Sequence, residues 1–150
     1  MTLTCTIPGR PEQQGSKRNL GRHSIEANPN LAPWRADAIW RLQKAMQEQM
    51  VVQFTGPVEV VATFVYARPR SHYGTGKNAG KVKAGAPMWK TSAADLDHLQ
   101  RALGDALTQS GALRDDALIA SWVAVKRWGP AGSTCVSVRG LDDGTRGYEE

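Results

Sequence analysis

The sequence contains the stretch Ala94-Asp95-Leu96-Asp97-His98-Leu99-Gln100-Arg101-Ala102-Leu103-Gly104-Asp105-Ala106-Leu107, with two carboxylates at its start. The leucines and alanines recur every three or four residues, which is the spacing of a helix face that packs on a core. Glycine commonly ends a helix, so Ser110-Gly111 marks the expected stop. The stretch therefore predicts a core helix that begins near Asp95 and carries both carboxylates at its first turn.

The two aspartates allow two interpretations. Residues two apart on a finished helix point to different sides, but an extended N-cap at Asp95 would let its carboxylate converge with that of Asp97. The first interpretation is capping, by Thr91, Ser92 or Asp95, because a helix N-terminus favours negative charge by about 0.3–1 kcal/mol. The second interpretation is a cation site.

A chain of 150 residues with 41% hydrophobic content is expected to form one domain with a sizeable core. No apolar run approaches the roughly 18 residues of a membrane span, and the N-terminus lacks a basic region followed by an apolar core. Cys5 and Cys135 stand alone without metal-ligand spacing, so we expect two free thiols in a reducing compartment. These features predict a cytoplasmic protein without membrane attachment.

The net charge of +5 is unevenly distributed along the chain. Residues 60–94 contain six lysines and arginines and no acidic residue. Such a run is either a solvated loop or a surface for a polyanion such as a nucleic acid. The acidic residues gather instead from residue 95 onward.

Four segments rich in β-branched residues predict a small sheet. They cover residues 2–8, 58–66, 117–128 and 133–139. Part of the segment 58–66 is continuously apolar, so that both of its faces are apolar there, which favours a central position in the sheet. A Gly- and Pro-containing turn at 129–132 separates the last two segments, so we expect them to pair as a hairpin.

Apolar spacing over residues 30–50 predicts a second main helix. The expected fold is α+β, a small mixed β-sheet with two main helices packed on it. Polar residues 12–30 and the Gly- and Lys-bearing residues 68–92 are interpreted as loops. One domain would span residues 1–140, followed by a flexible acidic tail at 141–150.

A further acidic pair, Asp115-Asp116, stands between the predicted helix and the strand that begins near Ala117. If that strand lies beside the helix, Asp116 would approach Asp95 and Asp97. Three carboxylates at one point repel each other unless cations occupy the site. Oxygen ligands of this kind suit Mg²⁺ or Mn²⁺, which also bind phosphate. An acidic metal site beside a basic loop fits phosphodiester hydrolysis in a nucleic acid.

Several motifs occur together in this order. Asp95-Leu96-Asp97 is followed by Asp105-Ala106-Leu107 and by Arg114-Asp115-Asp116. Upstream stand residues 9–18, Leu31-Ala32-Pro33-Trp34-Arg35 and residues 68–78. In this combination and spacing, the sequence from Pro8 to about Val138 resembles the RusA-type Holliday junction resolvases.

The resemblance implies that Asp95, Asp97 and Asp116 are catalytic carboxylates that hold Mg²⁺, with Mn²⁺ as the alternative and one or two ions per site. A one-residue shift of the strand start would put Asp115 in the place of Asp116. Arg101 stands where the family often has a functional lysine. It either clamps phosphate or forms an ion pair with an aspartate one turn away.

Two positions depart from the family pattern. Ala94 stands where proline is usual, and His98 stands where asparagine or lysine is usual. His98 is either a surface residue or a further group for phosphate or metal. These departures bear on rate and metal preference more than on the class of reaction.

The resemblance also implies contacts with branched DNA and a homodimer, since two symmetric nicks call for two sites related by a dyad. Trp34 or Trp40 would supply the dimer interface. The cell would be bacterial or phage-infected. We expect the DNA-binding residues to be Lys17, Arg18, Arg68, Arg70, His72, Lys77, Lys81, Lys83 and Lys90.

The function predicted from these features is a Mg²⁺-dependent, structure-selective endonuclease that cleaves four-way junctions during recombination and repair. Two alternatives stay open. The chain could be a non-catalytic nucleic-acid-binding module of the same fold, with its carboxylates serving as caps. It could also be a nuclease directed at flaps or RNA that shares the metal site.

Overall fold

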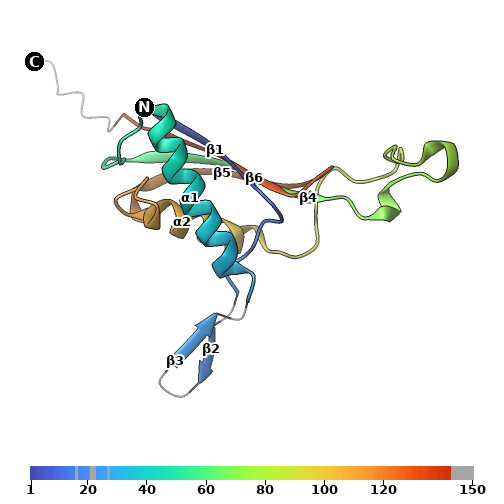
Figure 1. The fold of residues 1–150 in the computed structure, drawn as a ribbon, viewed down its shortest axis with the longest axis horizontal. Helices are drawn as coiled ribbons and strands as arrows, with labels where there is room; N and C mark the ends of the chain where they lie inside the picture. Colours follow the sequence, from blue (N-terminus) through green and yellow to red (C-terminus); the bar gives the residue numbers. More distant parts are fainter. Residues whose placement is uncertain (16, 21–22, 27, 143–150) are drawn as a thin grey trace, which may run out of the picture.

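A four-stranded sheet is built from β1 (Thr2–Pro8), β4 (Val58–Ala67), β5 (Ile119–Gly129) and β6 (Ser133–Gly140) (Figure 1). This computed structural model describes residues 1–15, 17–20, 23–26 and 28–142. The strand order is β1-β6-β4-β5, in which β6 pairs antiparallel with β1 and β4, and β4 pairs parallel with β5. The sheet is therefore mixed, and β4 is central, as its apolar sequence predicted.

Two helices, α1 (Leu31–Gln49) and α2 (Leu96–Gln109), cover one face of the sheet (Figure 1). Residues of both helices and alternate residues of β4, among them Val60 and Phe64, form one buried cluster. Leu99 and Leu103 of α2 are fully buried in this cluster, because the apolar spacing places them on the helix face toward the sheet. The α+β fold predicted from the sequence is confirmed.

The hairpin predicted for residues 117–139 is wrong. β5 and β6 lie on opposite sides of β4 and do not pair with each other. The reason is that α2 connects β4 to β5 as a crossover, which makes these two strands parallel neighbours. The turn at 130–132 then carries the chain around the end of β4. Gly129 is required at this point because a Cβ there would lie 2.5 Å from Val65 Cγ1.

The polar N-terminal segment is also more regular than predicted. Within residues 12–30, β2 (Lys17–Leu20) and β3 (His23–Glu26) form an antiparallel pair that stands apart from the main sheet (Figure 1). Of the predicted acidic tail, residues 143–150 lie outside the described residues. None of the described helices is long and apolar enough to cross a membrane.

Residues 68–92, which we call the arm, extend away from the end of the sheet (Figure 1). The outgoing part contains two 3₁₀ segments, Arg70–His72 (η1) and Gly76–Asn78 (η2). The returning part runs along the outer edge of β5, where the Lys90 N–H donates to the Lys126 carbonyl and the Trp128 N–H donates to the Met88 carbonyl. The arm is thus anchored to β5.

The end of α1 offers a test of the backbone conformation. Met50 has φ 55° and ψ 41° and is 89% exposed, so its side chain contributes little packing there. A non-glycine residue in this left-handed region costs about 1–2 kcal/mol. We expect Met50→Gly to raise the free energy of unfolding by about 1 kcal/mol in urea denaturation, net of the chain entropy of glycine.

The matched control is Gln47→Gly, which lies in the last turn of α1 with helical backbone. Glycine inside a helix lowers stability by about 1 kcal/mol, so the two substitutions should act in opposite directions. A loss of stability in both variants would contradict the left-handed conformation at Met50.

Candidate active site

The start of α2 gathers three potential metal ligands. One ligand atom from each of Asp95, Asp97 and His98 lies within 4.8 Å of the others. His98 stands between the two carboxylates, with Nδ1 4.0 Å from Asp95 Oδ2 and Nε2 3.9 Å from Asp97 Oδ2. Asp95 has an extended backbone at the N-cap, and this conformation lets the two carboxylates approach each other. We call these three residues the acidic group.

The carboxylates of the acidic group are not used to cap α2. Asp95 occupies the N-cap position, but its side chain makes no capping hydrogen bond. The side chains of Asp95 and Asp97 are 70% and 80% exposed. Both side chains are therefore largely open to solvent, and the capping interpretation is not supported by a hydrogen bond in the structure.

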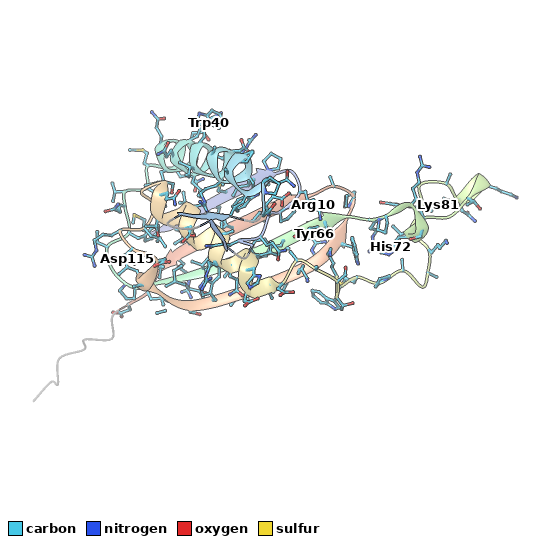
Figure 2. All side chains as sticks on the ribbon, turned by 90° about the horizontal axis from the view of Figure 1, so that it is seen from below. Arg10, Trp40, Tyr66, His72, Lys81 and Asp115 are labelled. Carbon is cyan, nitrogen blue, oxygen red and sulfur yellow. The ribbon has the colours of Figure 1, made fainter. Side chains whose placement is uncertain are left out.

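The segment 10–14 packs beside the acidic group and positions it. Gln13 Oε1 accepts a hydrogen bond from the Asp95 N–H at 3.2 Å, and the Gln14 N–H donates to the His98 carbonyl at 3.3 Å. The buried Tyr66 anchors this segment, because its hydroxyl donates to the Pro11 carbonyl at 3.2 Å. Figure 2 shows Tyr66 beside Arg10 near the end of the sheet from which the arm leaves.

Two lysines hold the turn that leads into Asp95. The ammonium of Lys90 donates to Ser92 Oγ and to the carbonyls of Ser92 and Ala93. The ammonium of Lys126 on β5 donates to the carbonyls of Ser92 and Ala94. Three consecutive carbonyls therefore point toward two positive charges, and this arrangement fixes where α2 begins.

The position of Lys90 differs from the expected contact with DNA. Lys90 is only 7% exposed, and its ammonium lies over the rings of Tyr66 and Trp128, at 4.7 and 5.2 Å from their centroids. Burial, with smaller contributions from Lys126 and Arg10, lowers the pKa of Lys90. Its hydrogens are used inside the protein, so Lys90 supports the site instead of contacting DNA.

Sequence reasoning missed Lys126 and Tyr66 as part of the site. Both lie on strands whose alternating pattern predicted only that they belong to the sheet. A weak signal existed for Lys126, because a lysine near the end of an otherwise apolar strand commonly finds a specific partner. Nothing in the local sequence predicted that Tyr66 would anchor segment 10–14.

The structure does not bring Asp116 to the acidic group. Asp116 starts the short 3₁₀ segment Asp116–Leu118 (η3), and a Cβ added to Gly104 would lie 4.0 Å from its Cβ. Gly104 is seven residues beyond Asp97, which corresponds to about 10 Å along the helix axis. Asp116 therefore lies beside the middle of α2, and it is not one of the three residues of the acidic group.

Asp116 belongs to a second set of acids with Asp105 and Asp115. A hydrogen bond that the protonated Asp116 carboxyl donates to Asp115, together with burial and the charges of Asp115 and Asp105, raises the pKa of Asp116. The Asp115 carboxylate accepts a hydrogen bond from the Ala117 N–H at 2.8 Å, which lowers its pKa. Asp105 also lies 3.8 Å from an Arg35 guanidinium nitrogen on α1.

Arg101 lies between these two sets of acids on the surface of α2. It is four residues from Asp97 and four from Asp105, so all three share one side of the helix. Within the described part of the chain, Arg101 forms no ion pair with either aspartate, and it is exposed. The helical ion pair is therefore not what this structure shows.

The arm presents the other basic residues predicted to bind DNA. Arg70, Lys77, Lys81 and Lys83 are exposed. Figure 2 shows Lys81 beyond His72 on the arm, at the opposite end of the molecule from Asp115. None of these four cations forms an ion pair with a described acidic residue, and the arm that carries them extends past the sheet (Figure 1).

Two basic residues at the base of the arm have structural contacts. The Arg68 guanidinium donates to the Pro87 carbonyl at 2.7 Å and lies 3.3 Å from His72 Nδ1. The His72 ring packs edge-on against Trp128, with 5.1 Å between centroids. Lys17 and Arg18 belong to β2, and their side chains lie outside what the structure describes.

The order of these features matches a known protein family. Residues 8–139 match the family model described as Endodeoxyribonuclease RusA. The chain belongs to this family. The match spans segment 10–14, the arm, the acidic group and Asp116, so every part of the site described above lies within the RusA region. A search of the curated proteins found no match to the chain.

The anchoring role of Tyr66 in this RusA domain predicts a pH dependence of stability. Burial raises the pKa of Tyr66 from 10.0 to about 12. The stability that the neutral phenol contributes is fully present below pH 10 and is lost as the pH rises toward 12. We expect Tyr66→Phe to be about 1 kcal/mol less stable than the wild type at pH 8, because the Pro11 carbonyl loses its donor.

By pH 11 the wild type should have lost about 1 kcal/mol relative to Tyr66→Phe, so that the two have similar stability in urea denaturation. Tyr73→Phe, on the arm, is the matched control and should follow the wild type. A difference between wild type and Tyr66→Phe that stays constant from pH 8 to 11 would contradict the assignment.

Proposed function

We propose that the chain is a metal-dependent, structure-selective endonuclease that cleaves four-way DNA junctions. The observation that carries this proposal is the acidic group, whose two exposed carboxylates converge without capping α2. Clustered negative charge of this kind opposes the binding of phosphate unless a cation is present. Membership of an endodeoxyribonuclease family gives the cluster its substrate, the phosphodiester of DNA.

The donor set of the acidic group fits a divalent cation. Carboxylate oxygens of Asp95 and Asp97 suit Mg²⁺ or Mn²⁺, and the His98 imidazole favours Mn²⁺ of the two. A bound cation would polarise the scissile phosphate and lower the pKa of an attacking water. Asp116 is not a member of the acidic group in this arrangement. Its role as a ligand, and a second ion near Asp105, stay predictions.

The protein's own residues supply two further elements of the mechanism. The exposed Arg101 guanidinium, one turn from Asp97, would neutralise charge that develops on the phosphate in the transition state. Lys90 and Lys126 act indirectly, because they fix the turn from which Asp95 projects. Arg101 stays charged throughout, so the proton needed by the leaving oxygen comes from another donor.

The exposed cations of the arm support recognition of DNA by its backbone. The arm that carries Lys77, Lys81 and Lys83 extends away from the sheet and α2 (Figure 1), so these lysines would contact phosphates outside the scissile bond. Contacts of this kind hold the position of the DNA without reading its sequence. Selectivity for a junction would then depend on its branched shape.

The alternatives from the sequence differ in how well the geometry supports them. A non-catalytic binding module would gain nothing from two carboxylates that do not cap α2 and that repel phosphate. A nuclease directed at flaps or RNA would use the same acidic group. Measuring which of a four-way junction, a flap and an RNA duplex the protein cleaves with Mg²⁺ distinguishes this alternative.

A two-fold homodimer is part of the proposal, since symmetric nicks need two sites. Trp34 is buried in the core and therefore cannot form the interface. Trp40 is exposed on α1, with the charged ends of Arg41 and Lys44 5.8 and 5.1 Å from its ring centroid. Of the two predicted tryptophans, Trp40 is the one that can contact a second copy.

The metal role of the acidic group is tested by Asp97→Asn. This change keeps the shape of an exposed side chain and removes one negative ligand, so folding should be preserved. We expect Mg²⁺-dependent cleavage of a four-way junction to fall by orders of magnitude. Junction binding in a chelator should persist or tighten, because a charge that repels phosphate is gone.

Glu59→Gln on β4 is the matched control, with the same change in net charge at a residue that pairs with Arg139. It should cleave like the wild type. Cleavage by Asp97→Asn at the wild-type rate, with circular dichroism showing a folded protein, would contradict the mechanism. The same measurement on Asp116→Asn decides whether that residue takes part.

The role of the arm is tested by the triple substitution of Lys77, Lys81 and Lys83 with alanine. Each lost phosphate contact lowers the slope of log affinity against log salt by about 0.9 on duplex arms, so the slope should fall by roughly 2.7. Fluorescence anisotropy with a labelled junction at several salt concentrations measures it. Arg139→Ala on β6 should leave the slope unchanged, and an unchanged slope in the triple variant would mean that the arm does not touch DNA.

A further inference from the structure

The outer part of the arm has a defined shape of its own. Tyr73 pairs with Val82, and Gly74 pairs with Ala79. The Gly74 N–H donates to the Lys81 carbonyl at 2.9 Å, and the Lys83 N–H donates to the His72 carbonyl at 2.8 Å. These backbone contacts close the arm on itself far from the core, so its shape does not depend on packing against the sheet.

Close backbone approach at Gly74 sets the form of this closure. A Cβ at residue 74 would lie 2.6 Å from Asn78 Cβ and 2.7 Å from the Asn78 carbonyl oxygen, which no side chain permits. Gly80 has φ +82°, a conformation that favours glycine. The two glycines therefore allow a tight loop that leaves space beside Tyr73.

That space is a hollow of about 440 Å³ lined by Arg70, Tyr73, Gly74, Thr75, Ala79 and Gly80. The volume lies within the range of about 300–1,000 Å³ typical of small-molecule sites. Most of its lining is small or apolar, with one aromatic ring and one guanidinium. Such a lining favours a flat, uncharged ring system over a bare phosphate.

The charges around the hollow indicate what carries that ring. Lys77, Lys81 and Lys83 are exposed near it, and residues 60–94 contain no acidic side chain. A ligand that combines a flat ring with flanking negative charges matches both the lining and its surroundings. A nucleotide within a DNA strand has this combination.

We propose that the hollow on the arm binds a single unpaired nucleobase of the DNA substrate, with its flanking phosphates held by the arm lysines. The inference rests on the proposed function for the identity of the substrate. Bases inside a duplex are stacked and paired, and they cannot enter the hollow, whereas a branch point offers unstacked bases at low cost. The hollow would therefore make the arm selective for branched over continuous DNA.

The test uses binding in a chelator, so that no cleavage is needed. Three labelled DNAs are compared by fluorescence anisotropy: a continuous duplex, the same duplex with one unpaired nucleotide, and that DNA with the unpaired base removed to leave an abasic site. Base stacking on an aromatic side chain predicts that the wild type prefers the unpaired base over the abasic site by roughly 5- to 150-fold.

Two variants locate this preference. Tyr73→Ala should abolish it and leave the affinity for the continuous duplex unchanged, whereas Tyr73→Phe, which keeps the ring, should retain it. Ala79→Leu fills the hollow without changing charge or the aromatic ring and should also abolish the preference. Equal binding of unpaired base and abasic site by the wild type would overturn the proposal. So would an equal loss of affinity for all three DNAs in both Tyr73→Ala and Ala79→Leu.

Cleavage of a four-way junction with Mg²⁺, measured in parallel, separates this inference from the proposed function. A wild type that prefers the unpaired base but does not cleave would support the hollow and contradict the endonuclease. A wild type that cleaves the junction without any such preference would support the endonuclease and contradict the hollow.

Discussion

The parallel pairing of β4 with β5 is the constraint on which the rest of the structure depends. Parallel neighbours need a crossover, and α2 provides it, so the buried leucines of α2 are pressed against the sheet. The same crossover brings Lys126, near the end of β5, beneath the turn at residues 92–94. The start of α2 is thus held from two directions, by apolar packing along the helix and by ammonium groups at its first turn. The position of the acidic group therefore depends on both the apolar packing and the ammonium groups.

The sequence predicted the elements that carry strong local patterns. α2 and β4 were found because helical spacing and a continuous apolar run are properties of the segment itself. The pairing of β5 was missed because a short Gly- and Pro-containing turn favours a hairpin locally, and only the burial of α2 overrides that preference. The two aspartate predictions differ in the same way. The approach of Asp95 to Asp97 follows from the local backbone at the N-cap and could be predicted. The place of Asp116 depends on where β5 begins along α2, which is a property of the tertiary structure.

The arm shows a different limit of sequence reasoning. Its lack of acidic residues is plain in the sequence and indicated either a solvated loop or a surface for a polyanion. The internal order of the arm could not be predicted. Glycines that permit close approach, such as Gly74, look the same in sequence as glycines that make a loop flexible. The sequence also does not distinguish a buried lysine of this run from an exposed one. Lys90 and Lys81 belong to one basic run, yet the first is buried over two aromatic rings and the second is exposed on the arm.

The return of the arm along β5 also bears on aggregation. β5 is an edge strand, and an edge presents unpaired N–H and carbonyl groups that can recruit a strand from another molecule. Hydrogen bonds with Met88 and Lys90 occupy the end of that edge nearest the arm. Lys126 and Arg127 add charge at the same place, which further discourages intermolecular pairing. The arm therefore also covers part of one edge of the sheet, and a chain without the arm would expose these backbone groups to pairing with another molecule.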